Sequence, residues 1–285
     1  MSKRILVTGA NGQLGQELRV LAPQYVEYQF DFVTRAVFDL EDEAQMYSYL
    51  NQIQPDYLIN CAAYTAVDRA ESEIEKADAI NHKAVGFLAS WCAANTCCFL
   101  HISTDYVFDG TSGKPYRETD VTNPQSVYGA SKLAGERAAQ AVNPDVIIIR
   151  TAWVYSEFGT NFVKTMLRLM EERDTLNIVD DQVGSPTYAA DLAQAILTIC
   201  LSADWIPGIY HYSNIGRISW FDFAKSIKQL THLDCKLEGI PTTAYPTPAK
   251  RPAYSLLDKT KIQDVYALKV PNFQSSLERC LTRLD

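Results

Sequence analysis

A short apolar run placed directly before a glycine-rich turn constrains the fold more than any other stretch. Residues 4–8 read RILVT, and these branched side chains predict a buried strand. Residues 9–15 read GANGQLG, after which Leu18 and Leu21 recur at helical spacing. In a strand–turn–helix unit, the first glycine permits a tight turn and the second lets backbone approach a ligand. The third lets the helix pack closely against the strand.

This turn predicts a dinucleotide site. Free N–H groups at the start of the helix, together with the helix dipole, attract the pyrophosphate of such a ligand. The alternative is a plain glycine-rich connection without a ligand. The position of the motif directly after the first strand favours the dinucleotide interpretation.

Strand-like and helix-like segments then alternate. Further strands are expected to run through Tyr28 to Phe32 and over residues 57–60, 99–102 and 146–150, with helical patterns between several of them. This rhythm predicts an α/β fold of Rossmann-like type, in which a doubly wound parallel sheet is followed by a smaller C-terminal α/β substrate domain. We expect residues 1–155 to form the dinucleotide-binding domain and residues 156–285 mainly the substrate-binding domain. Residues of about 180–201 are expected to return to the first domain.

Tyr128 and Lys132 stand four residues apart in a segment with helical character. The spacing puts both side chains on one helix face. A phenol ordinarily titrates near pH 10, and a neighbouring ammonium favours its ionised form and lowers its pKa. The pair is therefore a candidate acid–base device. A solvated helix face is the alternative, because both residue types are common there.

Two strand ends carry further candidate groups. Residues 103–110 read STDYVFDG, and this cluster of hydroxyl and carboxyl groups is typical of a site at the carboxyl edge of a parallel sheet. Arg35 follows the second strand, where a cation can hold the 2′-phosphate of NADP. We therefore expect NADPH, with NADH as the alternative.

Composition excludes several classes of function. The net charge of −8 argues against nucleic-acid binding, which requires clustered cations. No apolar run approaches the roughly 18 residues that span a bilayer, so no membrane partner is expected. The seven cysteines contain no C-x-x-C pair and the four histidines have no metal-ligand spacing. These observations predict reduced thiols, a cytoplasmic location and no metal ligands within the chain.

Several motifs in order resemble the extended short-chain dehydrogenase/reductase superfamily and, within it, the dTDP-4-dehydrorhamnose reductases. The likeness covers nearly the whole chain. Its more specific parts are residues 60–68 (NCAAYTAVD), 103–110, 151–155 (TAWVY), 181–187 (DQVGSPT) and 241–252. The resemblance implies reduction of the C4 keto group of dTDP-4-dehydro-L-rhamnose to dTDP-L-rhamnose by hydride from NAD(P)H.

The resemblance also implies roles for individual residues. Tyr128 would protonate the C4 oxygen, Lys132 would hold the nicotinamide ribose and lower the pKa of Tyr128, and Thr104 would polarise the carbonyl. Substrate contacts would come from Thr104, Asp105, Trp153 and Arg251, the last of these through a phosphate. The expected cofactor residues, besides Tyr128 and Lys132, are Gly9, Asn11, Gly12, Gln13, Leu14, Gly15, Arg35, Asp39, Leu40, Ala62, Ala63, Tyr64 and Thr65. For Trp153, a purely structural aromatic is the alternative.

One feature departs from the resemblance. Some members of this family are described as dimers bridged by Mg²⁺ through acidic side chains. Here Gln16-Glu17 and Ala190-Asp191 supply an incomplete acidic cluster. A homodimer and Mg²⁺ at its interface are therefore open expectations.

Three other functions are weighed against the reductase. Nucleotide-sugar 4,6-dehydratases resemble this chain but have Thr-Asp-Glu where Thr104-Asp105-Tyr106 stands, so elimination lacks its glutamate. Sugar 4-epimerases usually have longer chains. A non-enzymatic alternative is an NADP-binding regulatory subunit that resembles the β subunit of methionine adenosyltransferase. The sequence alone does not determine the nucleotide or the stereochemistry of the sugar.

Overall fold

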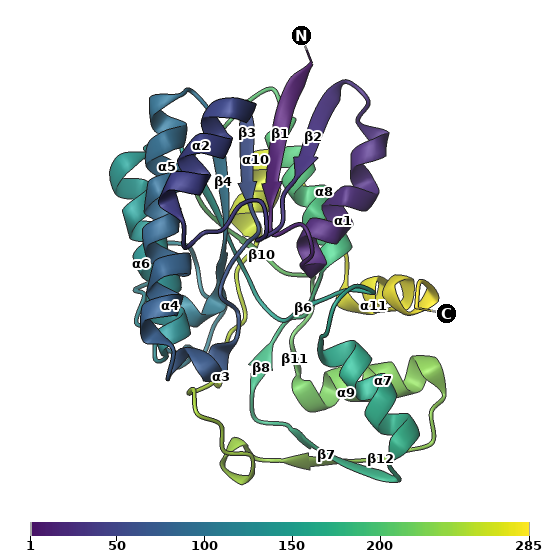
Figure 1. Cartoon of the computed structure of the whole chain (residues 1–285). Helices are drawn as coiled ribbons and strands as arrows, with labels where there is room; N and C mark the ends of the chain where they lie inside the picture. Colours follow the sequence, from purple (N-terminus) through teal and green to yellow (C-terminus); the bar gives the residue numbers. More distant parts are fainter. Residues whose placement is uncertain (1, 285) are drawn as a thin grey trace.

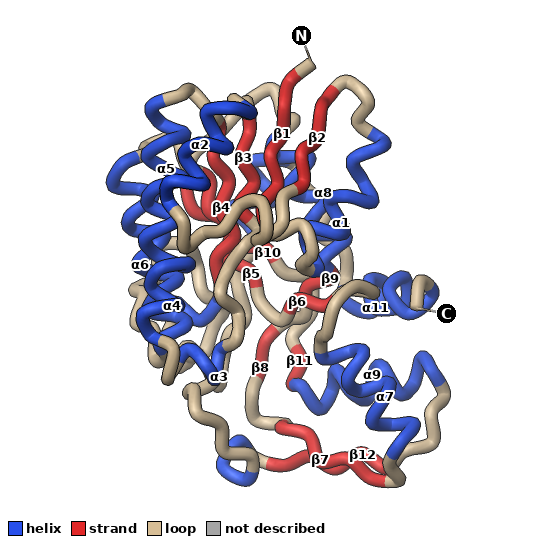
Figure 2. Tube along the Cα trace, viewed as in Figure 1, coloured by secondary structure: helices blue, strands red, loops and turns tan. Residues whose placement is uncertain are grey.

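A six-stranded parallel sheet forms the centre of the computed structural model, which describes residues 2–284 (Figures 1 and 2). Its strand order is β10-β5-β4-β3-β1-β2, and each neighbouring pair is parallel. The strands are β1 (Lys3–Thr8), β2 (Tyr28–Phe32), β3 (Tyr57–Asn60), β4 (Cys98–Thr104), β5 (Ile147–Thr151) and β10 (Gly208–Tyr212). The predicted doubly wound α/β fold is confirmed.

Helices cover both faces of this sheet, as Figure 1 shows. One face packs against α2 (Glu43–Ile53), α5 (Ala84–Ala94) and α6 (Val127–Val142). The other packs against α1 (Gln13–Leu21), α8 (Ala189–Cys200) and α10 (Thr260–Tyr266). Alternate residues of one strand divide between the two cores: Leu6 belongs to the first, Ile5 and Val7 to the second. Burial on both faces explains the continuous apolar runs of these strands.

Helix α6 is fixed at its start and along its buried face. The Ser126 side chain accepts a hydrogen bond from the Gly129 N–H and so caps the helix. Further along, Glu136 pairs with Arg150 of β5 at 2.6 Å, and both side chains are fully buried. Ser103 of β4 donates a hydrogen bond to the same carboxylate at 2.5 Å. The helix is thereby held against the ends of two central strands.

The remaining residues build a smaller unit below the sheet in Figure 1. Its core joins α7 (Phe162–Glu172), α9 (Trp220–Thr231) and α11 (Phe273–Thr282) with the parallel pair β7 (Thr175–Val179) and β12 (Lys236–Ile240). Short strands pair nearby, β6 (Val154–Tyr155) with β9 (Thr187–Tyr188) and β8 (Val183–Gly184) with β11 (Ile218–Ser219). Two small helices, α3 (Val67–Ala70) and α4 (Ile74–Asp78), and a π-helical turn at Ala79–Lys83 precede α5.

Two segments from the second half of the chain return to the first. Helix α8 packs on the sheet beside α1, in the region where a return was expected. Strand β10 pairs with β5 and completes the sheet, and the sequence analysis did not predict this strand. The domain boundary at residue 155 stays a prediction. Within residues 2–284, no helix is both long enough and apolar enough to cross a bilayer.

Candidate functional site

A cleft of about 830 Å³ opens where the central strands end. Residues that directly follow β1, β3, β4 and β5 line it, which is the expected position of a ligand site in a parallel sheet. Among the predicted site residues that line this cleft are Gly9, Asn11, Gly12, Gln13, Leu14, Gly15, Arg35, Asp39, Leu40, Ala62, Ala63, Tyr64, Thr65, Thr104, Asp105, Tyr128, Lys132 and Trp153.

The glycine turn brings backbone segments closer together than a side chain would allow. Gly9 has a positive φ of 68°, and a Cβ there would lie 2.8 Å from the backbone nitrogen of Ala62. At Gly15 a Cβ would lie 2.3 Å from the Gly9 carbonyl oxygen. No side chain caps the N-terminus of α1, and Gly12 and Gln13 at this end of the helix line the cleft. The Gly12 N–H donates a hydrogen bond to the Gly9 carbonyl at 2.9 Å and so closes the turn. A pyrophosphate fits such a cradle.

At one end of the cleft, Arg35 is surrounded by carboxylates. Its Nε lies 3.3 Å from Asp39, and its guanidinium also pairs with Glu41. The Arg35 side chain is 62 % exposed, so a ligand can reach it. Arg35 therefore lies beside Asp39. A cation such as Arg35 can hold a 2′-phosphate, and a carboxylate such as that of Asp39 can hold a ribose hydroxyl.

Tyr128 and Lys132 lie on the same side of the cleft, on the first half of α6. Lys132 Nζ donates a hydrogen bond to the Ile102 carbonyl at 2.6 Å, and burial lowers its pKa to about 8. Burial raises the pKa of Tyr128 to about 12, while the Thr104 hydroxyl acts against this rise. Burial is the largest cause, so the pKa of Tyr128 lies above its ordinary value, and the expected lowering of it by Lys132 stays a prediction.

Thr104 and Asp105 form a polar corner beside Tyr128. Thr104 Oγ1 donates to Asp105 Oδ1 at 3.0 Å and accepts from the Tyr106 N–H. Asp105 is 2 % exposed, and its Oδ2 has no hydrogen-bond partner within residues 2–284. Burial raises the pKa of this carboxyl to about 6. A buried acceptor without a partner at a cleft wall is suited to a hydroxyl-rich ligand.

Trp153 and Arg251 differ in their relation to the cleft. Trp153 lines it with a left-handed backbone, φ 50°, and its ring stacks on Trp220 with centroids 3.6 Å apart. Arg251 is absent from the cleft lining, and its guanidinium forms a two-point pair with Asp68 at 2.8 and 2.7 Å. The structure therefore does not bring Arg251 to the other site residues.

Several lining residues were not predicted individually. Thr151 ends β5 and Ala152 and Val154 follow it, and the sequence analysis noted this stretch only as part of the resemblance. Residues 159–160 and the charged Arg69, Glu73 and Lys76 also line the cleft. Charged side chains on short helices carry no distinguishing sequence signal, so reasoning from residue patterns did not identify them.

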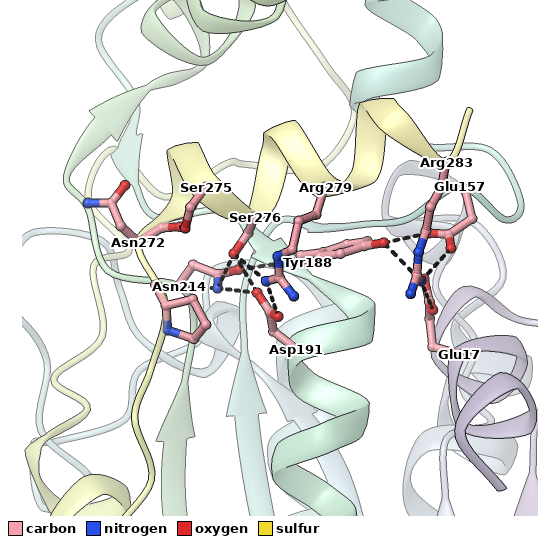
Figure 3. A network of polar contacts seen from close by, with 11 residues as sticks. Glu17, Glu157, Tyr188, Asp191, Asn214, Asn272, Ser275, Ser276, Arg279 and Arg283 are labelled. Carbon is pink, nitrogen blue, oxygen red and sulfur yellow. Dashed lines mark hydrogen bonds and ion pairs between the residues drawn. The ribbon is translucent and has the colours of Figure 1, made fainter. Parts of the chain in front are cut away.

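The acidic residues considered for Mg²⁺ have other partners (Figure 3). Asp191 pairs with Arg279 and accepts hydrogen bonds from Ser276 and Asn214. Glu17 accepts a hydrogen bond from Ser156 at 2.6 Å. Within residues 2–284, no group of three or more His, Cys, Asp or Glu side chains could hold a metal ion. The described residues at this position do not fit Mg²⁺.

Three features together define the class of protein: the parallel sheet, the glycine cradle and the Tyr–Lys pair. The class is that of Rossmann-fold oxidoreductases that use a nicotinamide dinucleotide. Residues 3–285 match the family described as RmlD substrate binding domain. The chain is 41% identical to dTDP-4-dehydrorhamnose reductase of Aggregatibacter actinomycetemcomitans, covering 96% of this chain and 97% of the relative. It is 40% identical to the Escherichia coli reductase, covering 98% and 97%. The chain belongs to the dTDP-4-dehydrorhamnose reductase family.

Solved structures agree with this assignment. A dTDP-4-dehydrorhamnose reductase from Bacillus anthracis in complex with NADP has a TM-score of 0.95 at 37% identity, covering 99% of this chain and 100% of the other. The Clostridium acetobutylicum reductase gives 0.94 at 38% identity, with 99% of both chains covered. A UDP-glucose 4-epimerase from Thermus thermophilus, 19% identical with a TM-score of 0.83 and covering 99% and 98%, shows only that the fold is shared.

Proposed function

We propose that this chain reduces the C4 keto group of dTDP-4-dehydro-L-rhamnose to the alcohol of dTDP-L-rhamnose. The observation that carries this proposal is the grouping of Tyr128, Lys132, Thr104 and Asp105 at one wall of the cleft, in a chain of this family. NADPH, when bound, supplies a hydride. The glycine cradle, with Ala62 to Thr65 opposite, would hold it.

Tyr128 is the proposed proton donor. Because its pKa is raised to about 12, the phenol keeps its proton at neutral pH and can give it to the carbonyl oxygen. Thr104 offers a hydroxyl beside the same oxygen, and Lys132 offers a positive charge that stabilises the phenolate formed. Asp105 and Trp153 would contact the sugar, through a carboxylate acceptor and an apolar wall. Arg251 remains a proposed phosphate contact that would first have to leave Asp68.

NADPH is the proposed cofactor, with NADH as the alternative. The NADP found with the Bacillus anthracis relative supports this choice, as does the exposed guanidinium of Arg35. The nearby Asp39 carboxylate is suited to the free ribose of NADH. The proposed location is the cytoplasm, and a homodimer stays a prediction.

The test is oxidation of NADPH by the purified chain with a panel of dTDP-, UDP- and GDP-linked 4-keto sugars. We expect turnover with dTDP-4-dehydro-L-rhamnose and less with the other nucleotides. NADPH binding without oxidation of any 4-keto sugar would contradict the proposal and would favour the regulatory-subunit alternative. Loss of water from a 4-hydroxy nucleotide sugar would instead indicate a dehydratase.

A further inference from the structure

A chain of buried hydrogen bonds runs from Lys132 into the sheet, behind the cleft. Lys132 Nζ lies 3.2 Å from His101 Nε2, and His101 Nδ1 lies 3.1 Å from Asn60 Nδ2. Thr8 Oγ1 donates to Asn60 Oδ1 at 2.6 Å and accepts from the Ala62 N–H at 3.2 Å. Each of the four side chains is at most 1 % exposed.

With the Asn60 amide placed as in the structure, Oδ1 toward Thr8 and Nδ2 toward His101, the direction of each bond can be followed along the chain. The Ala62 N–H can only donate, so Thr8 Oγ1 accepts from it and gives its own proton to Asn60 Oδ1. The Asn60 amide nitrogen then donates to His101 Nδ1, which must carry no proton. A neutral imidazole with a bare Nδ1 is protonated at Nε2, and this N–H points at Lys132 Nζ. This arrangement suits the neutral amine of Lys132, which has a lone pair to accept the Nε2–H.

When the direction of these hydrogen bonds is reversed, the arrangement suits the ammonium form of Lys132. Lys132 then donates to His101 Nε2, the imidazole proton lies on Nδ1, and a turned Asn60 amide accepts it through Oδ1. Burial and the charge of Lys132 hold the pKa of His101 well below its ordinary value. The imidazole therefore stays neutral and responds by changing tautomer. When the ammonium passes its proton to Nε2, Nδ1 releases one proton to solvent and the Asn60 amide turns, so the net change is the loss of one proton.

Resting on the proposed reductase activity, we propose that His101 is a positioning residue for Lys132. Its imidazole holds the amine at the cleft wall and, by exchanging tautomers, offers it a hydrogen-bond partner both with and without the extra proton. In each turnover the Tyr128 proton passes to the substrate oxygen, and the resulting phenolate regains a proton from water in the cleft. A partner that suits both charge states keeps the amine in place beside Tyr128 as the protonation of Lys132 changes with pH.

The other ionisable groups around Lys132 are less able to exchange a proton. Cys61, at the end of β3, has a pKa raised by burial, so its thiol stays neutral. Glu136, one turn further along α6, is already paired with Arg150 of β5. Tyr128 keeps its proton in the resting protein, because its pKa is raised to about 12. Lys132, whose pKa is about 8, is therefore the group in this cluster that gains or loses a proton near neutral pH.

The direct test is nitrogen-15 NMR of histidine-labelled protein without substrate, since the two imidazole shifts report which nitrogen carries the proton. His101→Gln identifies the His101 signals among those of the four histidines. We expect the proton to move from Nδ1 to Nε2 as the pH rises through about 8, and a fixed tautomer in Lys132→Met. A single wild-type tautomer across this range, or a doubly protonated imidazole, would overturn the proposal.

Kinetics provide a second measurement. His101→Leu removes the partner of the ammonium, so we expect kcat to fall about tenfold with little change in the KM of the nucleotide sugar, and the alkaline limb of the pH profile to move to lower pH. His101→Gln keeps an acceptor near Lys132 and should restore most of kcat at neutral pH. Equal losses in both variants with an unmoved pH profile would reduce His101 to a packing role. If the wild-type chain turns over no 4-keto sugar, the proposed function fails, while the NMR result still decides the role of His101.

Discussion

Burial shifts the pKa values of both side chains in the Tyr–Lys pair, in opposite directions. It raises the pKa of Tyr128 to about 12 and lowers the pKa of Lys132 to about 8, so at neutral pH the phenol is protonated and most of the amine is charged. Reduction of a carbonyl requires a proton donor, whereas oxidation of the alcohol requires the phenolate. Tyr128, the proposed proton donor, therefore carries its proton at neutral pH.

Removal of the Tyr128 hydroxyl should separate proton transfer from cofactor binding. We expect Tyr128→Phe to bind NADPH normally and to lose about 10²- to 10⁴-fold in kcat, because general acid catalysis contributes that much. Cofactor fluorescence measures the first quantity and NADPH oxidation the second. Tyr155→Phe is the matched control, since that buried hydroxyl has no hydrogen-bond partner within residues 2–284 and lies outside the cleft lining. Full turnover in Tyr128→Phe would remove this residue from the mechanism.

Arg35 should determine the choice between the two nicotinamide cofactors. We expect Arg35→Ala to raise the KM of NADPH about tenfold and to leave that of NADH nearly unchanged, because only the former carries a 2′-phosphate. Steady-state kinetics with both cofactors measures the ratio. Arg168→Ala removes an equally exposed arginine on α7 and should change neither constant. An unaltered ratio in Arg35→Ala would mean that the phosphate binds other groups.

At the scale of elements, α6 fixes the distance between Tyr128, the proposed proton donor, and the strand ends. Tyr128, Lys132 and Glu136 follow one another at four-residue intervals and so share a helix face. Glu136 is held by Arg150 of β5 and Ser103 of β4. This buried ion pair therefore sets the register of α6 against the strands that carry the polar corner.

Breaking that pair should cost far more than breaking an exposed one. We expect Glu136→Gln to lower the free energy of unfolding by about 3 kcal/mol, because Arg150 would remain charged and buried without its carboxylate. Glu172→Gln breaks the exposed pair with Arg168 and should change stability by less than about 0.5 kcal/mol. Urea unfolding measures both. Equal effects would show that α6 is held mainly by its apolar contacts.

Local sequence patterns predicted the elements that are specified by their own residues alone. These elements do not depend on pairing with distant segments of the chain. The strand before Gly9, the helix with Tyr128 and the polar end of β4 are of this kind, and the structure brings them to one cleft. Strand β10 depends on pairing with β5, roughly sixty residues earlier in the chain, and has no local signal of comparable strength. The phosphate role of Arg251 came from the resemblance, and its pairing with Asp68, far away in the sequence, has no local signal. Long-range pairing therefore accounts for what the sequence analysis missed.

At the scale of the whole molecule, the C-terminal helix joins the two units. Arg283, just after α11, lies 2.9 Å from Glu157 and 3.7 Å from Glu17 of α1 (Figure 3). Tyr188 donates a hydrogen bond to Glu157 at 3.0 Å. Burial and the neighbouring Glu157 raise the pKa of Glu17 to about 8, whereas the pKa of Glu157 is lowered. The junction thus holds one more proton than two ordinary carboxyl groups would at neutral pH.

This junction should make stability depend on pH. The pKa of Glu17 is about 4.5 in an unfolded chain and about 8 in the folded one, so the folded state binds its proton more tightly. The resulting stabilisation is complete below about pH 4.5 and is lost as the pH rises through about 8. Glu157, with a lowered pKa, acts only at more acidic pH.

We therefore expect the titration of Glu17 to contribute a downward slope of about 1–3 kcal/mol between pH 5 and pH 8 to the wild-type free energy of unfolding. Glu17→Gln should flatten this slope, because glutamine does not titrate, and Glu172→Gln on the exposed face of α7 should leave it unchanged. Urea unfolding at a series of pH values measures the slope. An identical slope in Glu17→Gln and wild type would assign it to other groups.

Because the chain is synthesised from its N-terminus, β10 is made late, and this order has a consequence for folding. A ribosome synthesises residues 1–151, including β5, well before it reaches Gly208–Tyr212. During this interval the outer edge of β5 lacks the neighbour that later covers it, and exposed edges of apolar strands promote aggregation. The nascent nucleotide-binding half therefore depends on late-emerging residues, and chaperones have an interval in which to protect it.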